Sequence, residues 1–311
     1  MAYTLAEGNK HSTTKLQAAT IDYLRKEDPI LERLKWKTIV GNSLTYNVVA
    51  TRATAGFYDV GDTWAESTHT VTTNTVTIKI LGGDADVDNF LKQTRSNIQD
   101  VEKEILQQKV VAVRETFLDR FFYGDTTSEA KGFDGLHRLM TSTTYNTVHA
   151  GSSTGTALSM EKLDAAIDLI KKPFKPDLII SSKAMRRGVT TYLRSIGSAF
   201  PQGADKFGIP VRYYNDIPWV VSDYVVDTET AASGAYSAKT GGANTTIWVL
   251  SFNEAGVSGA SNGNLTTEKV GQLQTKDAVR FRIKWYCGLM FQDLASSAKV
   301  DGIITASTVT A

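Results

Sequence analysis

The chain has 311 residues, a formal net charge of +1, 41% hydrophobic and 22% charged residues, and one cysteine. A chain of this length can bury a substantial core in two domains or in one elaborated domain. The balanced charge carries no signature of a nucleic-acid or acidic ligand, and one cysteine excludes a disulfide framework and a multi-cysteine zinc site. Residues 1–24 lack the pattern of a signal peptide and no apolar run reaches about 18 residues, so we expect a soluble, intracellular protein without a membrane span.

The N-terminal segment has a polar start and a short apolar continuation. Apolar residues recur at helical spacing from Thr14 to about Lys35, with a break at Pro29. The hook after the break, Ile30 to Trp36, is apolar, and nothing next to it in the sequence is suited to cover it. We therefore expect an arm here rather than a domain.

Residues 43–80 are expected to form a long two-stranded hairpin. The stretches SLTYNVVATR and TVTTNTVTIKI are rich in Thr, Val, Ile and Tyr, as strands are. The connection AGFYDVGDTWAEST holds two glycines and two aromatic residues expected to be exposed, Phe57 and Trp64. An isolated hairpin is only marginally stable, and a Thr-rich face is not a core face, so we expect the hairpin to lie on another subunit.

The strongest helical signal covers residues 96–123. Ser96 and Gln99 form a capping box, and apolar residues then recur every three or four positions without Gly or Pro. The predicted helix is roughly 40 Å long. Gly124 stands where a left-handed C-terminal cap is expected.

Three acids follow this helix in the stretch GDTTSEAKGFDGL. A catalytic group of Asp125, Glu129 and Asp134 would need a pocket and separated environments for its acid and base, which so polar a loop does not offer. We interpret the stretch as a corner in a scaffold, with Phe133 and Leu136 buried and Asp134 available to cap a turn.

The rest of the chain alternates between short helices and strands. Helices are expected at 159–173 and 183–195, two short strands at 209–223, and single strands at 177–182, 245–252 and 279–293, with a last strand in KVDGIIT. A small-residue loop, DTETAASGAYSAKTGGAN, precedes the strand at 245–252. This order predicts a mixed α/β region.

One stretch matches a catalytic motif literally. Gly259-Ala-Ser261-Asn-Gly263 fits the G-x-S-x-G nucleophile elbow, which needs a strand before the serine and a helix directly after it. The sequence that follows is polar and turn-like, and no histidine comes after the serine. We interpret the stretch as a glycine-serine turn, and a serine hydrolase using Ser261 remains an alternative from another class of protein.

Three alternating acids, Asp84, Asp86 and Asp88, resemble the start of a calcium loop. The EF-hand pattern fails because Asn89 and Arg95 stand at its sixth and twelfth positions. The main interpretation is a solvated acidic edge, and weak cation binding is left open.

Two further features have a structural and a functional interpretation. Cys287 lies in the apolar stretch WYCGLMF and is expected to be a buried, inert thiol. Arg186, Arg187 and Arg194 lie on one predicted helix, where a face in water is the first interpretation and contact with a phosphate backbone is the second.

The order of these parts resembles the major capsid proteins of tailed bacteriophages, whose fold is shared by encapsulin nanocompartment shells. The stretches that carry the resemblance are ATIDYLRKEDPILERLKWKTIVGN, FFYGD followed by KGFDGL, FGIPVRYYNDIP, and VRFRIKWYCGLMFQDLASSAKVDGI. Together they cover nearly the whole chain, from about residue 15 to about residue 305.

The resemblance implies an α+β fold of the phage major-capsid type in four parts. These are an N-terminal arm at 1–40, an extended β-hairpin loop at 41–82 across a neighbouring subunit, a peripheral domain at 83–154 and 265–311 with a spine helix at 96–123, and a mixed α/β axial domain at 155–264. The loop at 226–243 would lie near the centre of the capsomer.

The resemblance also implies a structural protein without catalytic residues, cofactor or metal. Such a protein self-assembles as hexamers and pentamers into the icosahedral head that encloses double-stranded DNA, in the virion and assembled in the bacterial cytoplasm. Because only about 40 residues precede the hairpin, a separate scaffolding protein, or none, is implied. A portal, a decoration protein and non-specific contact with DNA on the inner face complete the expected partners, with no membrane. The candidate assembly contacts are Arg52, Phe57, Asp62, Trp64, Glu66 and Tyr236.

An encapsulin that packages an enzyme is the alternative within shell proteins. The length of the chain and its Thr-rich tail favour the phage capsid.

Overall fold

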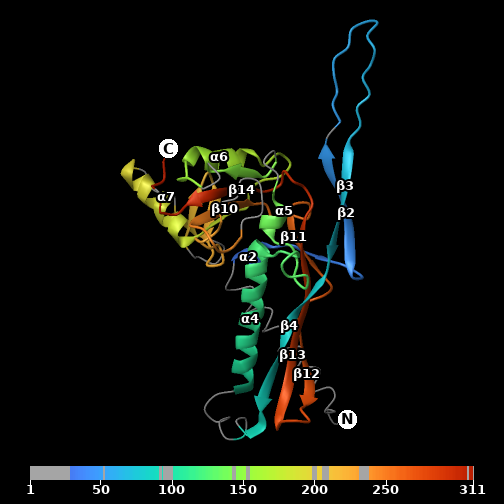
Figure 1. The fold of residues 1–311 in the computed structure, drawn as a ribbon, viewed down its shortest axis with the longest axis vertical. Helices are drawn as coiled ribbons and strands as arrows, with labels where there is room; N and C mark the ends of the chain where they lie inside the picture. The colour runs from blue at the N-terminus through green and yellow to red at the C-terminus, as the bar shows by residue number, and fades with distance from the viewer. Residues whose placement is uncertain are drawn as a thin grey trace.

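The computed structural model describes residues 29–51, 53–90, 93, 101–141, 145–151, 155–197, 202–204, 210–230, 238–306 and 308–310. They form a five-stranded sheet, a seven-stranded sheet and a two-stranded hairpin, together with helices, which confirms the α+β class (Figure 1). Among these residues no helix is both long and apolar enough to cross a membrane.

Strand β13 (Ala278–Phe291) is the centre of the five-stranded sheet. β11 (Val257–Ser261) and β12 (Thr266–Gln272) pair with its two halves along one edge, and β4 (Lys79–Asp88) pairs along the other. β1 (Trp36–Thr38) then adds to β11 in parallel. In the middle of β13 buried and partly exposed residues alternate, as in a strand with one covered face.

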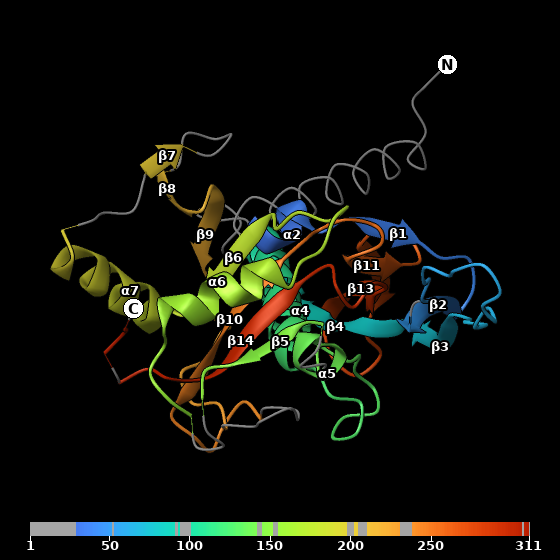
Figure 2. The same cartoon turned by 90° about the horizontal axis from the view of Figure 1, so that it is seen from above.

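The seven-stranded sheet is built from segments that are far apart in the sequence. It runs in the order β5-β14-β10-β6-β9-β8-β7, which Figure 2 shows from above. The β5–β14 and β6–β9 pairs are parallel and the others antiparallel. The strands are β5 (Thr147–His149), β6 (Leu178–Ser181), β7 (Gln202–Ala204), β8 (Pro210–Tyr214), β9 (Ile217–Val221), β10 (Asn244–Leu250) and β14 (Ala298–Ile304).

Different helices cover the two faces of this sheet. Ile179 and Val249 pack in one core with α6 (Met160–Asp168) and α7 (Lys183–Ser195), whereas Trp248 belongs to the core around α4. Because both faces are covered, β6 and β10 are buried at every position. The strands and helices predicted here from sequence are confirmed, with small shifts at their ends.

Helix α4 (Val101–Tyr123) is the long helix predicted from the sequence. Its predicted start, including the capping box at Ser96 and Gln99, lies outside the described residues. The predicted apolar stripe is buried between Leu106 and Phe121. The stripe packs on β4 and β13, so this helix lies beside the five-stranded sheet along its length (Figure 1).

The last turns of α4 contact both sheets. The ring of Phe117 lies 5.6 Å from Trp36 and 4.9 Å from Trp285 of the five-stranded sheet, between ring centroids. The ring of Phe122 lies 5.8 Å from Trp248 of the seven-stranded sheet. Phe117 and Phe122 are fully buried, so the end of this helix joins the two sheets through aromatic packing.

Gly124 ends α4 for a reason other than the one predicted. Its φ is not positive, so it is not a left-handed cap. A Cβ at Gly124 would lie 2.2 Å from the carbonyl oxygen of Phe133, and Gly135 N donates a 2.9 Å hydrogen bond to Gly124 O. The glycine is required because two backbone segments meet at this point.

The acids of the corner hold its backbone together. Asp125 Oδ1 accepts a hydrogen bond from Thr127 N (3.0 Å), and this bond is the main cause that lowers the pKa of Asp125. Asp134 Oδ1 accepts from Thr126 N (2.8 Å), and Glu129 forms an ion pair with Arg120. Phe133 and Leu136 are buried, so the interpretation as a scaffold corner is confirmed.

The hairpin of β2 (Ser43–Thr51) and β3 (Thr70–Thr77) is attached to the body at its base. Leu44 and Val76 pack against a small core that includes Met290, and the Tyr46 hydroxyl donates a 3.2 Å hydrogen bond to Phe291 O. Beyond the base, the hairpin projects from the body and β3 is exposed along nearly its whole length (Figure 1).

Four segments lie in other parts of the fold than expected. The hook at the end of the predicted arm is part of the body, because Ile30 and Leu31 of α2 (Pro29–Arg33) are buried in the main core and β1 pairs with β11. β11, expected in the axial domain, pairs with β13. β14 and β5, expected in the peripheral domain, lie in the seven-stranded sheet. Pairing across the chain, which the sequence order does not reveal, causes each difference.

Removal of the Phe117 side chain tests the aromatic connection. We expect Phe117→Ala to lower the free energy of unfolding by about 3–5 kcal/mol, because the cavity would lie among four aromatic neighbours. Urea denaturation of the purified chain measures this change. The matched control is Phe57→Ala at an exposed position, for which we expect less than about 0.5 kcal/mol. Equal effects of the two substitutions would contradict the packing of Phe117 in the aromatic core.

Candidate assembly surfaces and a buried polar junction

The hairpin tip presents aromatic and apolar side chains to solvent. Phe57, Val60 and Trp64 are exposed. The Tyr58 ring stacks on Trp64 with centroids 4.6 Å apart, and the Tyr58 hydroxyl accepts a 3.1 Å hydrogen bond from Ala65 N. Exposed apolar groups clustered at one site mark a surface for interaction.

Two aspartates shape the turn at the tip. Asp62 Oδ2 accepts a 2.7 Å hydrogen bond from Asp59 N, and Asp59 Oδ1 accepts one from Val60 N at 2.7 Å. The backbone N–H of Asp62 also donates to Asp59 O (3.1 Å). The turn is therefore ordered by its own carboxylates, and it holds the aromatic residues at the far end of the hairpin.

The predicted assembly contacts divide into two groups. Four of them lie together on the hairpin tip: Phe57, Asp62, Trp64 and Glu66. The other two, Arg52 and Tyr236, lie outside the described residues. Asp62 has an intramolecular role in the turn in addition to any contact with a neighbour.

The alternating acids on β4 are paired with arginines on β13. Arg282 Nε and Arg280 Nε donate to Asp84 and Asp86, each at 2.7 Å, and each guanidinium makes a second bond at 2.9 Å. These hydrogen bonds are the main cause that holds the pKa of both carboxyl groups below the usual value. In place of a solvated acidic edge, the structure shows a ladder of bidentate ion pairs on the outer face of the sheet. Within the described ranges no group of three or more His, Cys, Asp or Glu residues could hold a metal ion.

Ser261 lacks the setting of a catalytic nucleophile. It is the last residue of the buried strand β11, and its carbonyl accepts a 2.8 Å hydrogen bond from Ile39 N. A turn and strand β12 follow, where an elbow would need a helix. The predicted glycine-serine turn therefore begins only after the serine. Cys287 is buried as expected, and burial raises the pKa of its thiol to about 12.

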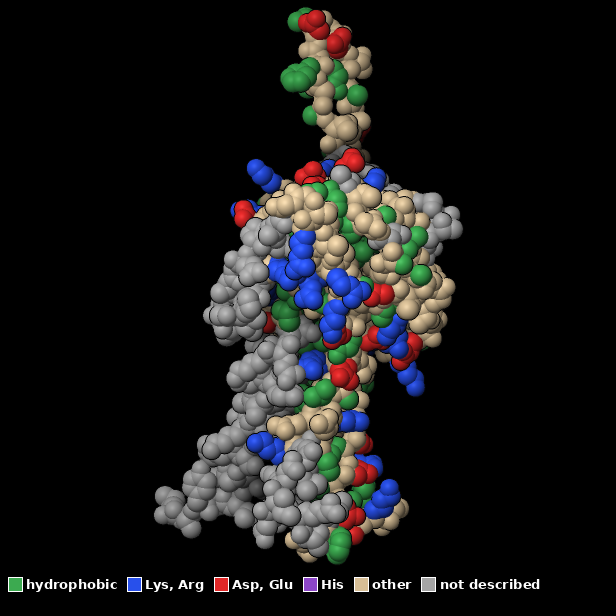
Figure 3. Space-filling model, turned by 90° about the vertical axis from the view of Figure 1, so that its left-hand side faces the viewer, with side chains coloured by type: hydrophobic (Ala, Val, Ile, Leu, Met, Phe, Trp, Pro, Cys, Tyr) green, Lys and Arg blue, Asp and Glu red, His purple; other side chains and the backbone are tan. Residues whose placement is uncertain are grey.

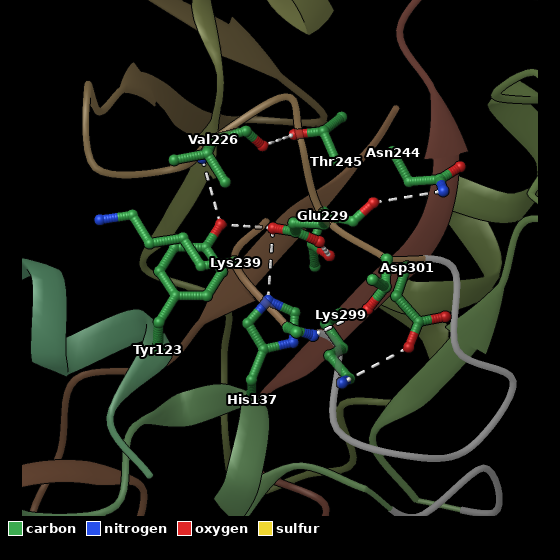
Figure 4. Close-up of polar contacts among 12 residues, drawn as sticks. Tyr123, His137, Val226, Glu229, Lys239, Asn244, Thr245, Lys299 and Asp301 are labelled. Atoms are coloured by element: carbon green, nitrogen blue, oxygen red, sulfur yellow. Dashed lines mark hydrogen bonds and ion pairs between the residues drawn. The ribbon is translucent and has the colours of Figure 1, made fainter. Parts of the chain in front are cut away.

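A buried carboxylate lies where α4 meets the seven-stranded sheet. Glu229 is fully buried in the segment between β9 and β10. It accepts hydrogen bonds from the Tyr123 hydroxyl (2.5 Å) and His137 Nε2 (3.3 Å), as Figure 4 shows. It also accepts one from the Thr246 hydroxyl (2.5 Å). Tyr123 is the last residue of α4 and His137 lies on α5 (Leu136–Leu139), so one carboxylate connects four segments.

A second buried pair lies beside the first on β14. Lys299 Nζ is 3.4 Å from Asp301 Oδ2, and both side chains are fully buried. Asp301, labelled with Lys299 in Figure 4, also contacts His149 Nδ1 from β5. The Lys299 ammonium lies 5.8 Å from the centre of the Trp248 ring. We call these residues, with Glu229 and its partners, the polar junction.

Burial controls the ionisation of the polar junction. Desolvation lowers the pKa of His137 and of Lys299, which disfavours the cationic form of each. Desolvation, together with the charge of Glu229, raises the pKa of Tyr123, so its hydroxyl stays a hydrogen-bond donor. The polar junction thus fixes how α4 and α5 meet the sheet, because its groups must keep their partners while buried.

The polar junction is built from residues that are far apart in the sequence. Its members come from residues 123, 137, 149, 229, 246, 299 and 301, so no local pattern joins them. One signal was present in the sequence. Lys299 and Asp301 are two charges in an otherwise apolar closing strand, and at a spacing of two they lie on the same face.

Comparison with known proteins identifies the fold. No family model and no curated protein matches the chain. The SrpI encapsulin of Synechococcus elongatus PCC 7942 has a similar structure, with a TM-score of 0.68, 16% identity and 92% of each chain covered. The capsid of the native GTA particle (TM-score 0.62, 14% identity, 90% of each chain) and the structure described as Mycobacterium phage Bobi (0.56, 13%, 89% of this chain and 90% of the other) are similar too. The chain therefore has the fold shared by phage capsids and encapsulins.

The polar junction predicts a dependence of stability on pH. Because the pKa of His137 is lowered by folding, its contribution is complete above about pH 6.5 and is lost as the pH falls below that value, by up to about 1.4 kcal/mol per pH unit. In His137→Gln the amide can still donate to Glu229 but does not titrate, so the loss below pH 6.5 should be smaller. Urea denaturation between pH 5 and 8 measures both curves. His69→Gln, at an exposed position, is the control, and parallel curves for wild type and His137→Gln would refute the prediction.

Proposed function

We propose that this chain is a major capsid protein that self-assembles into the icosahedral head shell of a tailed bacteriophage. The observation that carries the proposal is the hairpin, which is anchored at its base and ends in exposed aromatic residues. The fold shared with phage capsids and encapsulins supports it. The chain would act as a structural protein, without a catalytic residue, cofactor or metal.

An incomplete surface is the physical reason for assembly. A two-stranded hairpin has little stability alone, and here almost all of β3 is exposed beyond the base. A neighbouring copy that covers the hairpin would bury Phe57, Val60 and Trp64. Permanent interfaces of this kind bury about 2,000–5,000 Å² in total. A closed shell with many such contacts needs only modest energy from each.

The parts of the fold receive the following roles in this proposal. The hairpin is the extended loop that crosses a neighbour. α4 with the lower part of the five-stranded sheet, β4, β12 and β13, is the peripheral domain with its spine helix. The seven-stranded sheet with α6 and α7 is the axial domain, and the segment at 226–243, much of it outside the described residues, is nearest the centre of the capsomer.

The partners follow from the same proposal. Copies of this chain would form hexamers and pentamers, a portal protein would occupy one vertex, and a separate scaffolding protein would guide assembly in the bacterial cytoplasm. A decoration protein is a further candidate partner. Double-stranded DNA would fill the shell of the virion, in non-specific contact with its inner face. The small net charge of +1 keeps repulsion between copies low.

The similarity to the SrpI encapsulin favours a second candidate, an encapsulin-type shell around a protein cargo. Electron microscopy of the purified full-length protein tests both shell proposals, which predict closed particles. A strictly monomeric species at high concentration would overturn them. Nuclease-protected duplex DNA in native particles supports the phage capsid, and a co-purifying enzyme supports the encapsulin.

Removal of the hairpin tip tests the assembly surface. We expect deletion of residues 55–68 to leave the circular dichroism spectrum and the cooperative unfolding of the chain intact, because these residues, all exposed except the half-buried Tyr58, belong to none of the hydrophobic cores. The yield of shells in sedimentation and electron microscopy should fall at least tenfold, since the neighbour loses its aromatic contacts.

Point variants distinguish loss of the aromatic side chains from shortening of the hairpin. Phe57→Ser with Trp64→Ser should reproduce the defect. Val40→Ser with Val270→Ser, at exposed apolar positions away from the tip, should assemble normally. Normal shells from the deleted chain would refute the assignment of the hairpin.

A further inference from the structure

Helix α7 gathers its cations on one side. It holds four, Lys183, Arg186, Arg187 and Arg194, and no acidic residue. At 3.6 residues per turn these four fall within an arc of about 100°. Figure 3 shows Lys and Arg side chains gathered on the side of the molecule where α7 lies in Figure 1. The chain as a whole carries a net charge of only +1, so this concentration is local.

The opposite side of α7 fixes the direction of this arc. Met185 and Val189 are buried against the seven-stranded sheet, on the helix face away from the cations. Arg187 and Arg194 are exposed, and Arg186 is half-buried. The packing of the helix therefore presents the cations outward.

A fifth cation reaches the same face from a neighbouring strand. Arg212 of β8 donates from Nη1 to the hydroxyl of Thr190, at 2.9 Å, and Thr190 lies within the arc of the α7 cations. We call Lys183, Arg186, Arg187, Arg194 and Arg212 the basic face.

Few internal acids compensate the basic face. Lys183 forms an exposed ion pair with Asp223, at 2.5 Å. Arg187 and Arg194 form no ion pair within the described part of the chain, and Nε of Arg186 has no hydrogen-bond partner there. Among the described residues one acid pairs with the four cations of α7, which leaves a surface that attracts a polyanion.

We propose that the basic face of α7 binds the phosphate backbone of duplex DNA. Between residues 183 and 194 the helix extends about 16 Å, along which a duplex presents about nine or ten phosphates. Guanidinium groups suit this ligand because each can donate two parallel hydrogen bonds to a phosphate. Contacts with phosphates do not depend on the base sequence, and this suits a shell that holds DNA of any sequence. This inference rests on the proposed function, which supplies the DNA.

Charge removal on the helix tests the proposal. The full-length unassembled chain is titrated against a fluorescent 24-base-pair duplex of mixed sequence, at several salt concentrations between 50 and 200 mM. The variant R186Q/R187Q/R194Q should lose at least tenfold in affinity at the lowest salt. The slope of log K against log salt should fall in magnitude by about 2.7, because each phosphate contact contributes about 0.9.

A control variant separates the basic face from net charge. K131Q/K269Q/K276Q removes the same charge at exposed positions in the corner loop, in β12 and in the turn before β13. We expect its affinity for the duplex to stay within about twofold of wild type, with an unchanged salt slope. R187Q/R194Q, restricted to exposed positions, is the second variant should R186Q disturb folding, and it should lower the slope by about 1.8.

The outcomes distinguish this inference from the proposed function. Equal losses in the two triple variants, or no loss in R186Q/R187Q/R194Q, would overturn the assignment of the basic face, as would a wild-type chain that does not bind duplex. A variant that keeps its DNA affinity but no longer assembles would show that the basic face contacts another copy, whose hairpin tip carries Asp59, Asp62 and Glu66. Absence of shells from a wild-type chain that binds DNA through α7 would refute the function and leave the inference standing.

Discussion

The C-terminal end of α4 is buried between two sheets, and the arrangement of the other elements depends on that burial. Phe117 packs on tryptophans of the five-stranded sheet, and Phe122 packs on Trp248 of the seven-stranded sheet. A helix end that is apolar on two sides cannot face water, so both sheets must be in place around it. The polar junction lies at the same point and adds directional bonds, which specify how the helix meets the sheet.

The side chains on the rest of the surface differ in whether they have partners within the chain. On the outer face of β13 and β4, arginines and aspartates neutralise one another in bidentate pairs. The hairpin tip exposes aromatic side chains, and Arg187 and Arg194 of α7 form no ion pair among the described residues. A fold that balances its charges on one sheet but leaves an aromatic tip and a cationic helix open is suited to contacts outside the single chain.

Periodicity in the sequence was enough to predict the long helix, α7, β13 and the hairpin, because each is encoded by residues next to one another. The order of these elements was then enough to predict the fold class. Pairing between distant segments was not predictable from one sequence, so β14 and β11 lie in other parts of the fold than expected. For the same reason Asp84 was expected on a solvated edge, whereas it is paired with Arg282. Regular spacing on both strands, DADVD and VRFRIK, was the one sign that Asp84 and Arg282 match. At Gly124 the sequence predicts the end of the helix but not its cause. A left-handed cap and a close backbone approach both require glycine, so the residue type does not distinguish them.

The position of β13 in the sequence has a consequence for synthesis. Three strands of the five-stranded sheet pair with β13, and the hairpin rests on Met290 and Phe291 at its end. The ribosome makes the hairpin more than 200 residues before this support exists. Such distant pairing makes folding slow and keeps nascent chains from completing their N-terminal half. The hairpin therefore gains its anchor on the body only in chains translated almost to the end, so a truncated chain would display a hairpin without its support.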